Sequence, residues 1–254
     1  GKVNPSGKLS ETIPLNLASV PSSPYYPGTE STCEYREGIF VGYRYYTTAG
    51  VPTMYPFGFG LSYTDFEYSG LRIENDRVFF SVTNIGAKDG AEVAQLYISP
   101  NTNGIFRPKE ELKGFERVYL LAGETKEICI QLNERSFALW STAENGWVTE
   151  PGEYRVLVGA SSTDIRLELC IEKEGAPVDD PYEGKTLDAY KTCNVQRVSD
   201  EEFTALLGKN PPRRTWNRHK PLEMNDCIAQ SEYLKSGIGK KMYRAFKTVN
   251  LGLK

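Results

Sequence analysis

Residues 35–63 read YREGIFVGYRYYTTAGVPTMYPFGFGLSY, and the segments on either side are interpreted in relation to this run. Tyrosine and phenylalanine recur among glycines throughout it. Glycines such as Gly38, Gly42, Gly58 and Gly60 let a backbone turn sharply or approach other atoms closely. The aromatic side chains bring large apolar area, with a polar tip on each tyrosine. The combination indicates a segment that packs between two bodies, with its rings filling a cleft at a domain junction.

Two parts of this run carry a resemblance to a known family. EGI at 37–39 with VGYRYY at 41–46, followed by PFGFGLSY at 56–63, resembles the junction near the C-terminal end of glycoside hydrolase family 3 enzymes. In those enzymes the segment leaves an α/β sandwich domain and enters a fibronectin type III-like β-sandwich. The start of the chain, GKVNPSGKL at 1–9 with TIP at 12–14, resembles the closing stretch of that α/β domain. The alternative for the aromatic rings is a wall that faces a sugar.

Beyond residue 63 the pattern changes to short alternating runs bounded by turn residues, which predicts an antiparallel β-sandwich. Strands are expected at 66–73, 78–83, 91–98, 112–120, 126–132, 146–149, 152–159 and 165–171. VTNIG at 82–86 and the stretch at 108–115 also resemble patterns of the terminal sandwich of the family. The predicted core comprises Phe66, Val78, Phe80, Val82, Val93, Leu96, Phe115, Ile128, Ile130, Tyr154, Val156 and Val158.

The expected fold is mainly β. It is a fibronectin type III-like (immunoglobulin-like) antiparallel β-sandwich, preceded by the tail of an α/β sandwich domain and followed by a short helical tail. The expected boundaries are 1–63 for the end of the α/β domain and the junction, 64–173 for the sandwich, 174–198 for a linker and 199–254 for the tail. A serine cap and a glycine stop predict a helix over 199–208. Apolar residues at helical spacing predict two helices within 226–249.

The composition is that of an ordinary globular protein, with 39% hydrophobic and 25% charged residues. The net charge of -3 is too small to indicate binding to nucleic acid or to an anionic membrane surface. No apolar run approaches the ~20 residues that span a bilayer. We therefore expect neither a nucleic-acid nor a membrane partner.

The five cysteines are Cys33, Cys129, Cys170, Cys193 and Cys227. They are widely spaced, and no C-x-x-C pair indicates zinc. Free thiols are favoured, so a cytoplasmic location is preferred over secretion, although the sequence leaves localisation open. Cys129 and Cys170 fall in strand-like apolar runs and are expected to be buried thiols. The alternative is that the two strands bring them together as a disulfide.

The resemblance implies retaining glycoside hydrolysis, in which a nucleophilic carboxylate and an acid/base carboxyl lie about 5–5.5 Å apart. In the family the nucleophile is an aspartate on a (β/α)8 barrel, and the acid/base carboxyl comes from the α/β domain. Both are therefore expected outside this chain. Glu37 lies in the motif, but Arg36 and Arg44 are expected to keep it ionised and paired. No catalytic, cofactor-binding or metal-binding residue is predicted, no cofactor is expected, and the residues that bind substrate are left unassigned.

Other polar and aromatic residues have simpler interpretations. His219 lies in a proline-rich loop without a nucleophile motif nearby, and it is expected to be exposed to solvent. Four carboxylates are expected to be surface charges of the sandwich: Asp89, Glu92, Glu110 and Glu111. Trp140 and Trp147 are expected in the core, and stacking on a sugar face is the alternative.

The expected function is that of the C-terminal, non-catalytic supporting portion of a family 3 β-glycosidase, which hydrolyses O-glycosyl bonds, with β-glucosides as the expected substrates. The chain alone is expected to be inactive. Its partner would be the rest of the same glycosidase, namely the α/β domain and the catalytic barrel. Two alternatives remain. One is a self-standing carbohydrate- or protein-binding β-sandwich module, and the other is one half of a split glycosidase whose barrel is a separate polypeptide.

Overall fold

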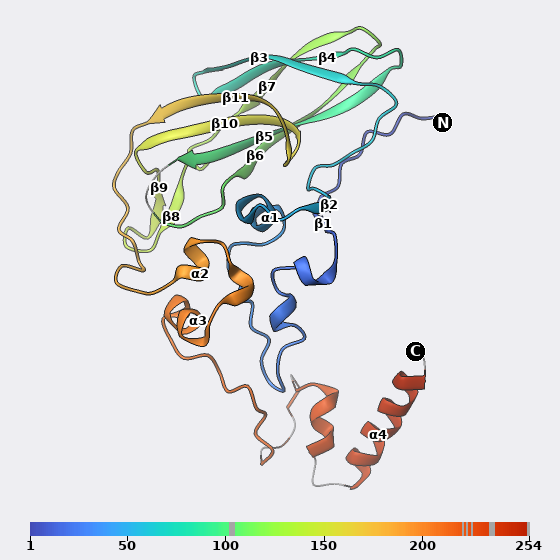
Figure 1. Ribbon diagram of the computed structural model, residues 1–254, viewed down its shortest axis with the longest axis vertical. Coiled ribbons are helices and arrows are strands. Elements are labelled where there is room, and N and C mark those ends of the chain that lie inside the picture. The colour runs from blue at the N-terminus through green and yellow to red at the C-terminus, as the bar shows by residue number, and fades with distance from the viewer. Residues whose placement is uncertain (102–104, 220, 222, 225, 234–236, 253–254) are drawn as a thin grey trace.

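The computed structural model describes residues 1–101, 105–219, 221, 223–224, 226–233 and 237–252. Its elements are β1 Ile13–Pro14, η1 Leu17–Ser19, η2 Ser23–Tyr25, α1 Tyr43–Ala49, β2 Thr53–Tyr55, β3 Phe66–Glu74, β4 Arg77–Asn84, β5 Gly90–Asn101, β6 Glu111–Leu120, β7 Thr125–Gln131, β8 Leu139–Ser141, β9 Gly146–Val148, β10 Gly152–Ser161, β11 Asp164–Lys173, α2 Asp188–Lys191, η3 Val195–Arg197, α3 Asp200–Leu207, η4 Ile228–Tyr233 and α4 Gly237–Gly252. A β-sandwich forms one end of the molecule, and α4 lies toward the other end (Figure 1).

Two antiparallel sheets make up the sandwich, which confirms the predicted fold class. One has the strand order β11-β10-β5-β6 and the other has the order β3-β4-β7. The β3–β4 hairpin turns at Asn75 and Asp76, whose φ angles are 47° and 60°. Positive φ at both central residues gives a turn whose twist matches that of the flanking strands, and Asn and Asp tolerate this conformation well. The sequence predicts a hairpin-type turn at Glu74, Asn75 and Asp76, and this turn is present.

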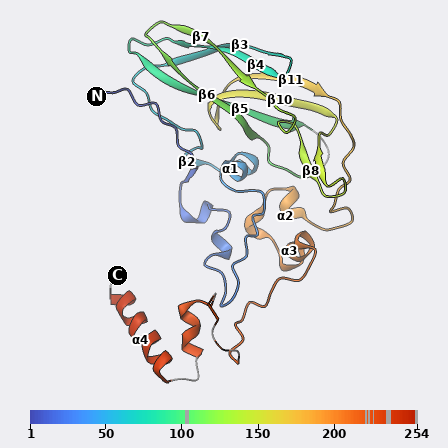
Figure 2. The same ribbon diagram turned by 180° about the vertical axis from the view of Figure 1, so that it is seen from behind.

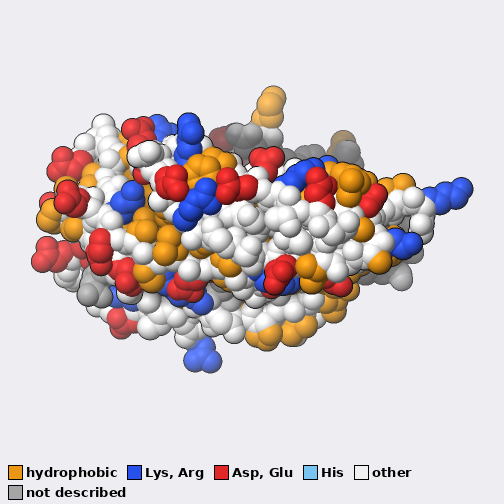
Figure 3. Space-filling model, turned by 90° about the horizontal axis from the view of Figure 1, so that it is seen from above, with side chains coloured by type: hydrophobic (Ala, Val, Ile, Leu, Met, Phe, Trp, Pro, Cys, Tyr) orange, Lys and Arg blue, Asp and Glu red, His pale blue; other side chains and the backbone are white. Residues whose placement is uncertain are grey.

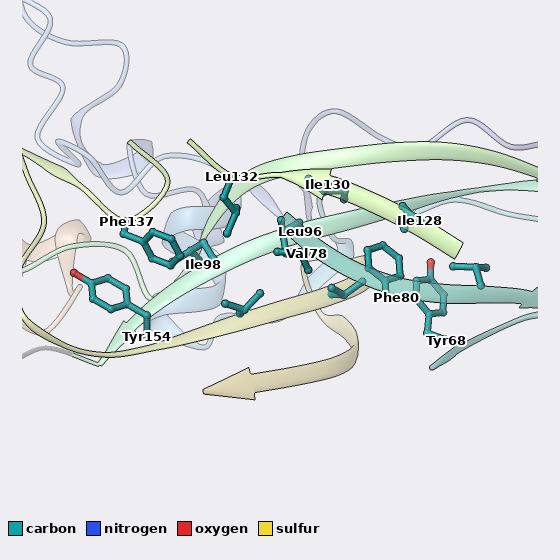
Figure 4. Packing of buried hydrophobic residues seen from close by; sticks show 14 of the residues in the cluster. Tyr68, Val78, Phe80, Leu96, Ile98, Ile128, Ile130, Leu132, Phe137 and Tyr154 are labelled. Carbon is teal, nitrogen blue, oxygen red and sulfur yellow. The ribbon is translucent and has the colours of Figure 1, made fainter. Parts of the chain in front are cut away.

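The hydrophobic core lies between the two sheets, and Figure 4 shows its side chains meeting from both. Most of the predicted core is confirmed: Val78, Phe80, Val82, Leu96, Ile128, Ile130, Tyr154, Val156 and Val158 are buried in it, and Phe66 packs against it partly buried. The rings of Tyr68 and Phe80 are stacked, with centroids 6.3 Å apart. Because successive side chains of a strand point to opposite faces, each of these strands contributes every second residue.

Two predicted core residues were wrong for the same reason. Phe115 is 64% exposed, and Val93 is only half-buried. The residue of β6 that faces the core is Gly114, because a Cβ atom added there would lie 2.5 Å from Cγ2 of Ile130. The neighbouring phenylalanine must therefore point outward. On β5 the core residue is Ala94, and Val93 faces the other way.

The predicted burial of Cys129 and Cys170 was also wrong. Both are exposed and all five cysteines are free, so the two strands do not join them. Ile128 and Ile130 occupy the core side of β7, which turns the intervening Cys129 outward.

On the face of the molecule shown in Figure 3, acidic and basic side chains are interspersed rather than gathered by sign.

Residues 174–198 form more structure than the expected linker. They contain α2 and η3, and they help to build a second hydrophobic cluster beside α1. Its buried members are Phe40, Tyr45, Tyr46, Leu187, Ala189, Tyr190, Cys193, Val195, Val198 and Phe203. From the front and from behind, α2 and α3 lie on the side of α1 away from the sheets (Figures 1 and 2). The junction therefore lies between two cores.

The tail begins with the predicted helix. Ser199 caps α3 in a capping box with Glu202, and Gly208 ends the helix at φ 67°. Two further helices follow as expected, η4 and α4, and the residues between them (234–236) lie outside the described part of the chain. Among the described residues, no helix has both the length and the apolar character needed to cross a membrane.

Candidate functional site

The junction, residues 35–63, lies on the outer face of the β11-β10-β5-β6 sheet. Tyr97 points outward from β5 and is fully buried there. The ring of Tyr43, on α1, meets the Tyr97 ring edge-on at 5.9 Å and the Phe57 ring at 4.8 Å. The hydroxyl of Tyr43 also accepts a hydrogen bond of 2.8 Å from the backbone N–H of Leu112 on β6. The junction thus forms a third layer over the sandwich.

A buried polar network fixes this layer. The Tyr97 hydroxyl donates to Oε1 of Gln95 at 2.7 Å, and the Gln95 amide donates to the carbonyl oxygens of Gly58 at 3.1 Å and Ala160 at 2.8 Å. Gly58 has a φ of +79°, and a Cβ atom there would lie 1.9 Å from Gln95 Oε1. A larger residue at this position would displace the Gln95 amide from its hydrogen bonds. The first functional feature is therefore the contact between the junction and β5, which we call the Gln95 seat.

The start of the chain is tied to the same place. The Lys8 ammonium donates to Glu92 Oε1 at 2.8 Å and to the carbonyl oxygen of Ala160 at 3.2 Å, and the side chains of Lys8 and Glu92 are only 14% and 6% exposed. Tyr68 donates a further hydrogen bond to the same carboxylate oxygen at 3.0 Å. Burial, with the adjacent Glu92 charge, raises the pKa of the Tyr68 hydroxyl above its ordinary value. Figure 2 shows the N-terminal segment running from the sandwich toward β2.

An ion-pair cluster joins the junction to the tail. Arg36 and Arg214 both bind Glu34 and Asp200. The Arg36 guanidinium also lies over the Phe203 ring, 4.9 Å from its centroid. Hydrogen bonds from Arg214 and Arg36 hold the pKa values of the Glu34 and Asp200 carboxyls below their ordinary values. These four charges hold the start of α3 against the first residues of the junction.

The expected pairing of Glu37 was wrong. Arg36 binds Glu34 and Asp200, and Arg44 binds Glu111 at 3.0 Å. Glu37 itself is 7% exposed, and no described group donates a hydrogen bond to its Oε2. The two arginines therefore form ion pairs with other carboxylates and not with Glu37.

Two of the four expected surface carboxylates are buried. Glu92 is 5% exposed and Glu110 is 3% exposed, whereas Asp89 is exposed and Glu111 is half-buried. Burial raises the pKa of the Glu110 carboxyl, and its Oε1 has no hydrogen-bond partner among the described residues. A glutamate and a glutamine inside the apolar run AEVAQLYI were the sequence signal for a buried polar seat, which the expectation of surface charges missed.

The two sandwich tryptophans are not in the core, which corrects that expectation. Trp140 on β8 and Trp147 on β9 face each other across a hairpin, with rings edge-on at 5.7 Å, and they are 48% and 47% exposed. They line a groove of about 480 Å³ together with residues of α1, β6 and the loop before β8. We call it the hairpin groove. Figure 1 shows β8 and β9 at the end of the sandwich that faces α2.

His219 is exposed, as predicted. Among the described residues, no group of three or more His, Cys, Asp and Glu side chains is arranged to hold a metal ion. The catalytic, cofactor and metal positions remain unassigned in this chain.

Comparison with known sequences supports the architecture. Residues 92–162 match the family model of the fibronectin type III-like domain. Thermostable β-glucosidase B of Acetivibrio thermocellus is 40% identical over 216 residues, which is 82% of this chain and 28% of that protein. An exo-α-(1->6)-L-arabinopyranosidase of Bifidobacterium breve is 46% identical over 180 residues, 69% of this chain and 24% of that protein. Across such relatives the chain spans 21–28% of their length.

Solved structures agree with this. The GH3 β-glucosidase of Bifidobacterium adolescentis matches with a TM-score of 0.66 at 37% identity. The match covers 95% of this chain and 30% of the β-glucosidase chain. β-Glucosidase 3B of Thermotoga neapolitana, in complex with α-D-glucose, gives a TM-score of 0.63 at 42% identity over 69% of this chain and 26% of its own. The chain is therefore similar in sequence and fold to a part of glycoside hydrolase family 3 β-glucosidases, and it contains a fibronectin type III-like domain.

Proposed function

We propose that this chain is the non-catalytic supporting portion of a family 3 β-glycosidase that hydrolyses O-glycosyl bonds, with β-glucosides as substrates. The observation that carries the proposal is the Gln95 seat. The sandwich holds the junction through a buried network in addition to the covalent connection, so it fixes the direction in which the preceding domain leaves. Catalytic groups displaced by about 1 Å can lose roughly 100-fold in rate, so this orientation matters for the chemistry.

The proposed partner is the rest of the glycosidase, namely the α/β domain and the catalytic barrel, on the same polypeptide or on a separate one. Residues 1–63 expose many large apolar side chains outside the hairpin groove: Leu15, Leu17, Tyr26, Tyr35, Val41, Leu61 and Tyr63. Large exposed apolar patches on soluble proteins mark interaction surfaces. We assign this surface to contact with the α/β domain, and the two carboxyls of the retaining mechanism to the partner domains.

The test uses the complete glycosidase and the substitution Gln95→Met, which keeps the side-chain volume and removes the hydrogen bond to Gly58 of the junction together with the one to Ala160 on β10. We expect kcat for an aryl β-glucoside to fall about 10- to 100-fold. The matched control is Glu67→Gln, an exposed position on β3. If Gln95→Met lowers the melting temperature but leaves kcat and KM at the wild-type values, the seat stabilises the fold without orienting the catalytic domains, and the proposal is wrong.

A further inference from the structure

The hairpin groove has the general features of a small-molecule site. Its volume of about 480 Å³ lies within the ~300–1,000 Å³ of known ligand pockets. Half-exposed Trp140 and Trp147 form one wall, and Ile39 of the junction adds apolar surface. Pockets that combine aromatic walls with a few convergent polar groups are typical of ligand sites. Nothing in the supporting role described above uses these tryptophans.

The charges of the groove indicate the kind of ligand. Its lining contains four cationic side chains, Arg44, Arg107, Lys113 and Arg135, and one carboxylate, Glu111. Glu111 is shared by Arg44 at 3.0 Å and Lys113 at 3.1 Å, and Arg107 binds the buried Glu150 at 2.8 Å. Four cations against two carboxylates leave an excess of two positive charges. The whole chain has a net charge of -3, so the groove is a local basic site on an acidic protein.

Arg135 is central to this excess. Its guanidinium lies over the ring of Trp147, 5.1 Å from the centroid. Within the part of the chain that the structure describes, no carboxylate pairs with it. Guanidinium groups bind carboxylates through two parallel hydrogen bonds, and the pairing is stronger than one between neutral groups. An anionic group on a ligand would therefore find its partner at Arg135.

We propose that the hairpin groove binds an acidic saccharide, a pyranoside that carries a carboxylate. The C–H face of the pyranose ring packs on Trp140, which carries no cation over its ring among the described contacts. The carboxylate pairs with Arg135 and the hydroxyl groups hydrogen-bond to Glu111 and Arg44. The choice of a saccharide rests on the proposed glycosidase function, whereas the pairing of a ring with an anion rests on the groove alone.

The experiment titrates the 254-residue chain, labelled with ¹⁵N in the tryptophan indoles, with a disaccharide that contains one glucuronate. The chain has three indole signals, from Trp140, Trp147 and Trp216. The third is 5% exposed and donates to Asp226 in the tail, so it serves as an internal reference for folding and for non-specific effects. We expect saturable shifts of the signals of Trp140 and Trp147 only. A neutral disaccharide should bind at least about tenfold more weakly, because it lacks the charge-assisted hydrogen bonds.

Variants refine the test. Trp140→Ala should weaken binding about tenfold or more, and Trp140→Phe should retain part of the affinity because it keeps an aromatic face. Arg135→Gln should abolish the preference for the acidic sugar. Its matched control is Arg72→Gln. Arg72 is on β3, outside the groove, and its guanidinium lies over the ring of Phe79, 4.6 Å from the centroid. A variant that keeps the Trp216 signal is folded, so its binding result counts.

Four outcomes would overturn the proposal. They are the absence of saturable shifts up to about 10 mM, equal affinity for the neutral sugar, unchanged binding by the Arg135→Gln variant, and binding of an acidic peptide in place of the saccharide. Hydrolysis is not measured, so the result is independent of the supporting role. A failed titration would not count against the proposed role of the Gln95 seat. An unchanged kcat in Gln95→Met would not count against binding in the hairpin groove.

Discussion

The amide of Gln95 reaches from the outer face of β5 to the carbonyl oxygen of Gly58, 3.1 Å away. The two residues are 37 positions apart in sequence, and their contact joins the junction to the sandwich at a point where a Cβ atom would lie 1.9 Å from the Gln95 side-chain oxygen. A side chain that donates two hydrogen bonds and accepts a third has one suitable position, so the junction has one orientation on the sheet.

Substituting Gly58 tests the seat. Gly58→Ala should destabilise the chain by about 2–4 kcal/mol, because the added methyl group combines strain at positive φ with overlap on Gln95. The measurement is the melting temperature of the chain. Gly184→Ala is the matched control, since Gly184 has a similar φ of +72° and nothing lies within 4 Å of its Cβ position. That control should cost only about 1 kcal/mol. Equal losses for both variants would show that Gln95 does not restrict Gly58.

The ion pair between Lys8 and Glu92 gives a second prediction. Lys8→Met should lower stability by about 3 kcal/mol, because it leaves a carboxylate that is 6% exposed without its cation. The comparison is Arg166→Met, which breaks a pair whose side chains are 44% and 46% exposed and should cost ~0–1 kcal/mol. Urea unfolding of both variants measures the difference. A loss no larger than that of Arg166→Met would mean that the N-terminal segment does not depend on this contact.

Acid should release the tail before it unfolds the sandwich. The pKa values of Glu34 and Asp200 are lowered by Arg214 and Arg36, so the ion-pair cluster contributes its full stability above their unfolded pKa, near ~4, and loses it as pH falls through the lower folded values. The hydrogen bond that Glu30 accepts from Tyr233 lowers the pKa of the Glu30 carboxyl. Glu30 also accepts a hydrogen bond from the backbone N–H of Trp216, and this bond to the tail likewise weakens as pH falls.

The readout is Trp216 fluorescence in a Trp140→Phe/Trp147→Phe background, followed beside the circular dichroism of the strands as pH falls from 7. We expect the fluorescence to change at a higher pH than the circular dichroism. In Asp200→Asn, part of the fluorescence change should already be present at pH 7. Coincident transitions in both signals would contradict a separately docked tail.

Thiol labelling tests the second core. Burial raises the pKa of the Cys193 thiol to about 11, whereas Cys33, Cys129, Cys170 and Cys227 are exposed. Iodoacetamide at neutral pH should therefore modify four cysteines in the folded chain and all five in denaturant, because the thiolate is the reactive form. Mass spectrometry of the peptides identifies the protected residue. Rapid labelling of Cys193 would show that residues 174–198 are not held against α1.

The sequence predicted the sandwich well because alternation marks the strands and because the hairpin turn has its own chemistry at Asn75 and Asp76. It failed where the choice of face depends on one residue. Gly114 and Phe115 are adjacent, and an argument from hydrophobicity assigns the core to the phenylalanine. In the structure Gly114 faces the core instead, because Ile130 of the opposite sheet occupies the space in front of it.

The site was harder to predict than the fold. Charge proximity in sequence suggested that Arg36 and Arg44 pair with Glu37, but the arginines reach Glu34, Asp200 and Glu111, which are up to 164 residues away. Asp200 and Glu111 are long-range partners that no local pattern reveals, whereas Glu34 lies only two residues from Arg36. Within residues 174–198, α2 and η3 are likewise too short to show a periodic pattern of apolar residues. Their burial depends on packing against α1 and not on a periodic face.

The most direct test of the supporting role is hydrolysis of an aryl β-glucoside by the purified 254-residue chain, compared with the complete glycosidase under the same conditions. Both carboxyls of the retaining mechanism are assigned to other domains, so we predict no turnover by the chain and restored turnover in the complete enzyme. Turnover by the chain alone at an enzyme-like rate, about 1 s⁻¹ or more, would contradict the supporting role and would require a catalytic pair within these residues.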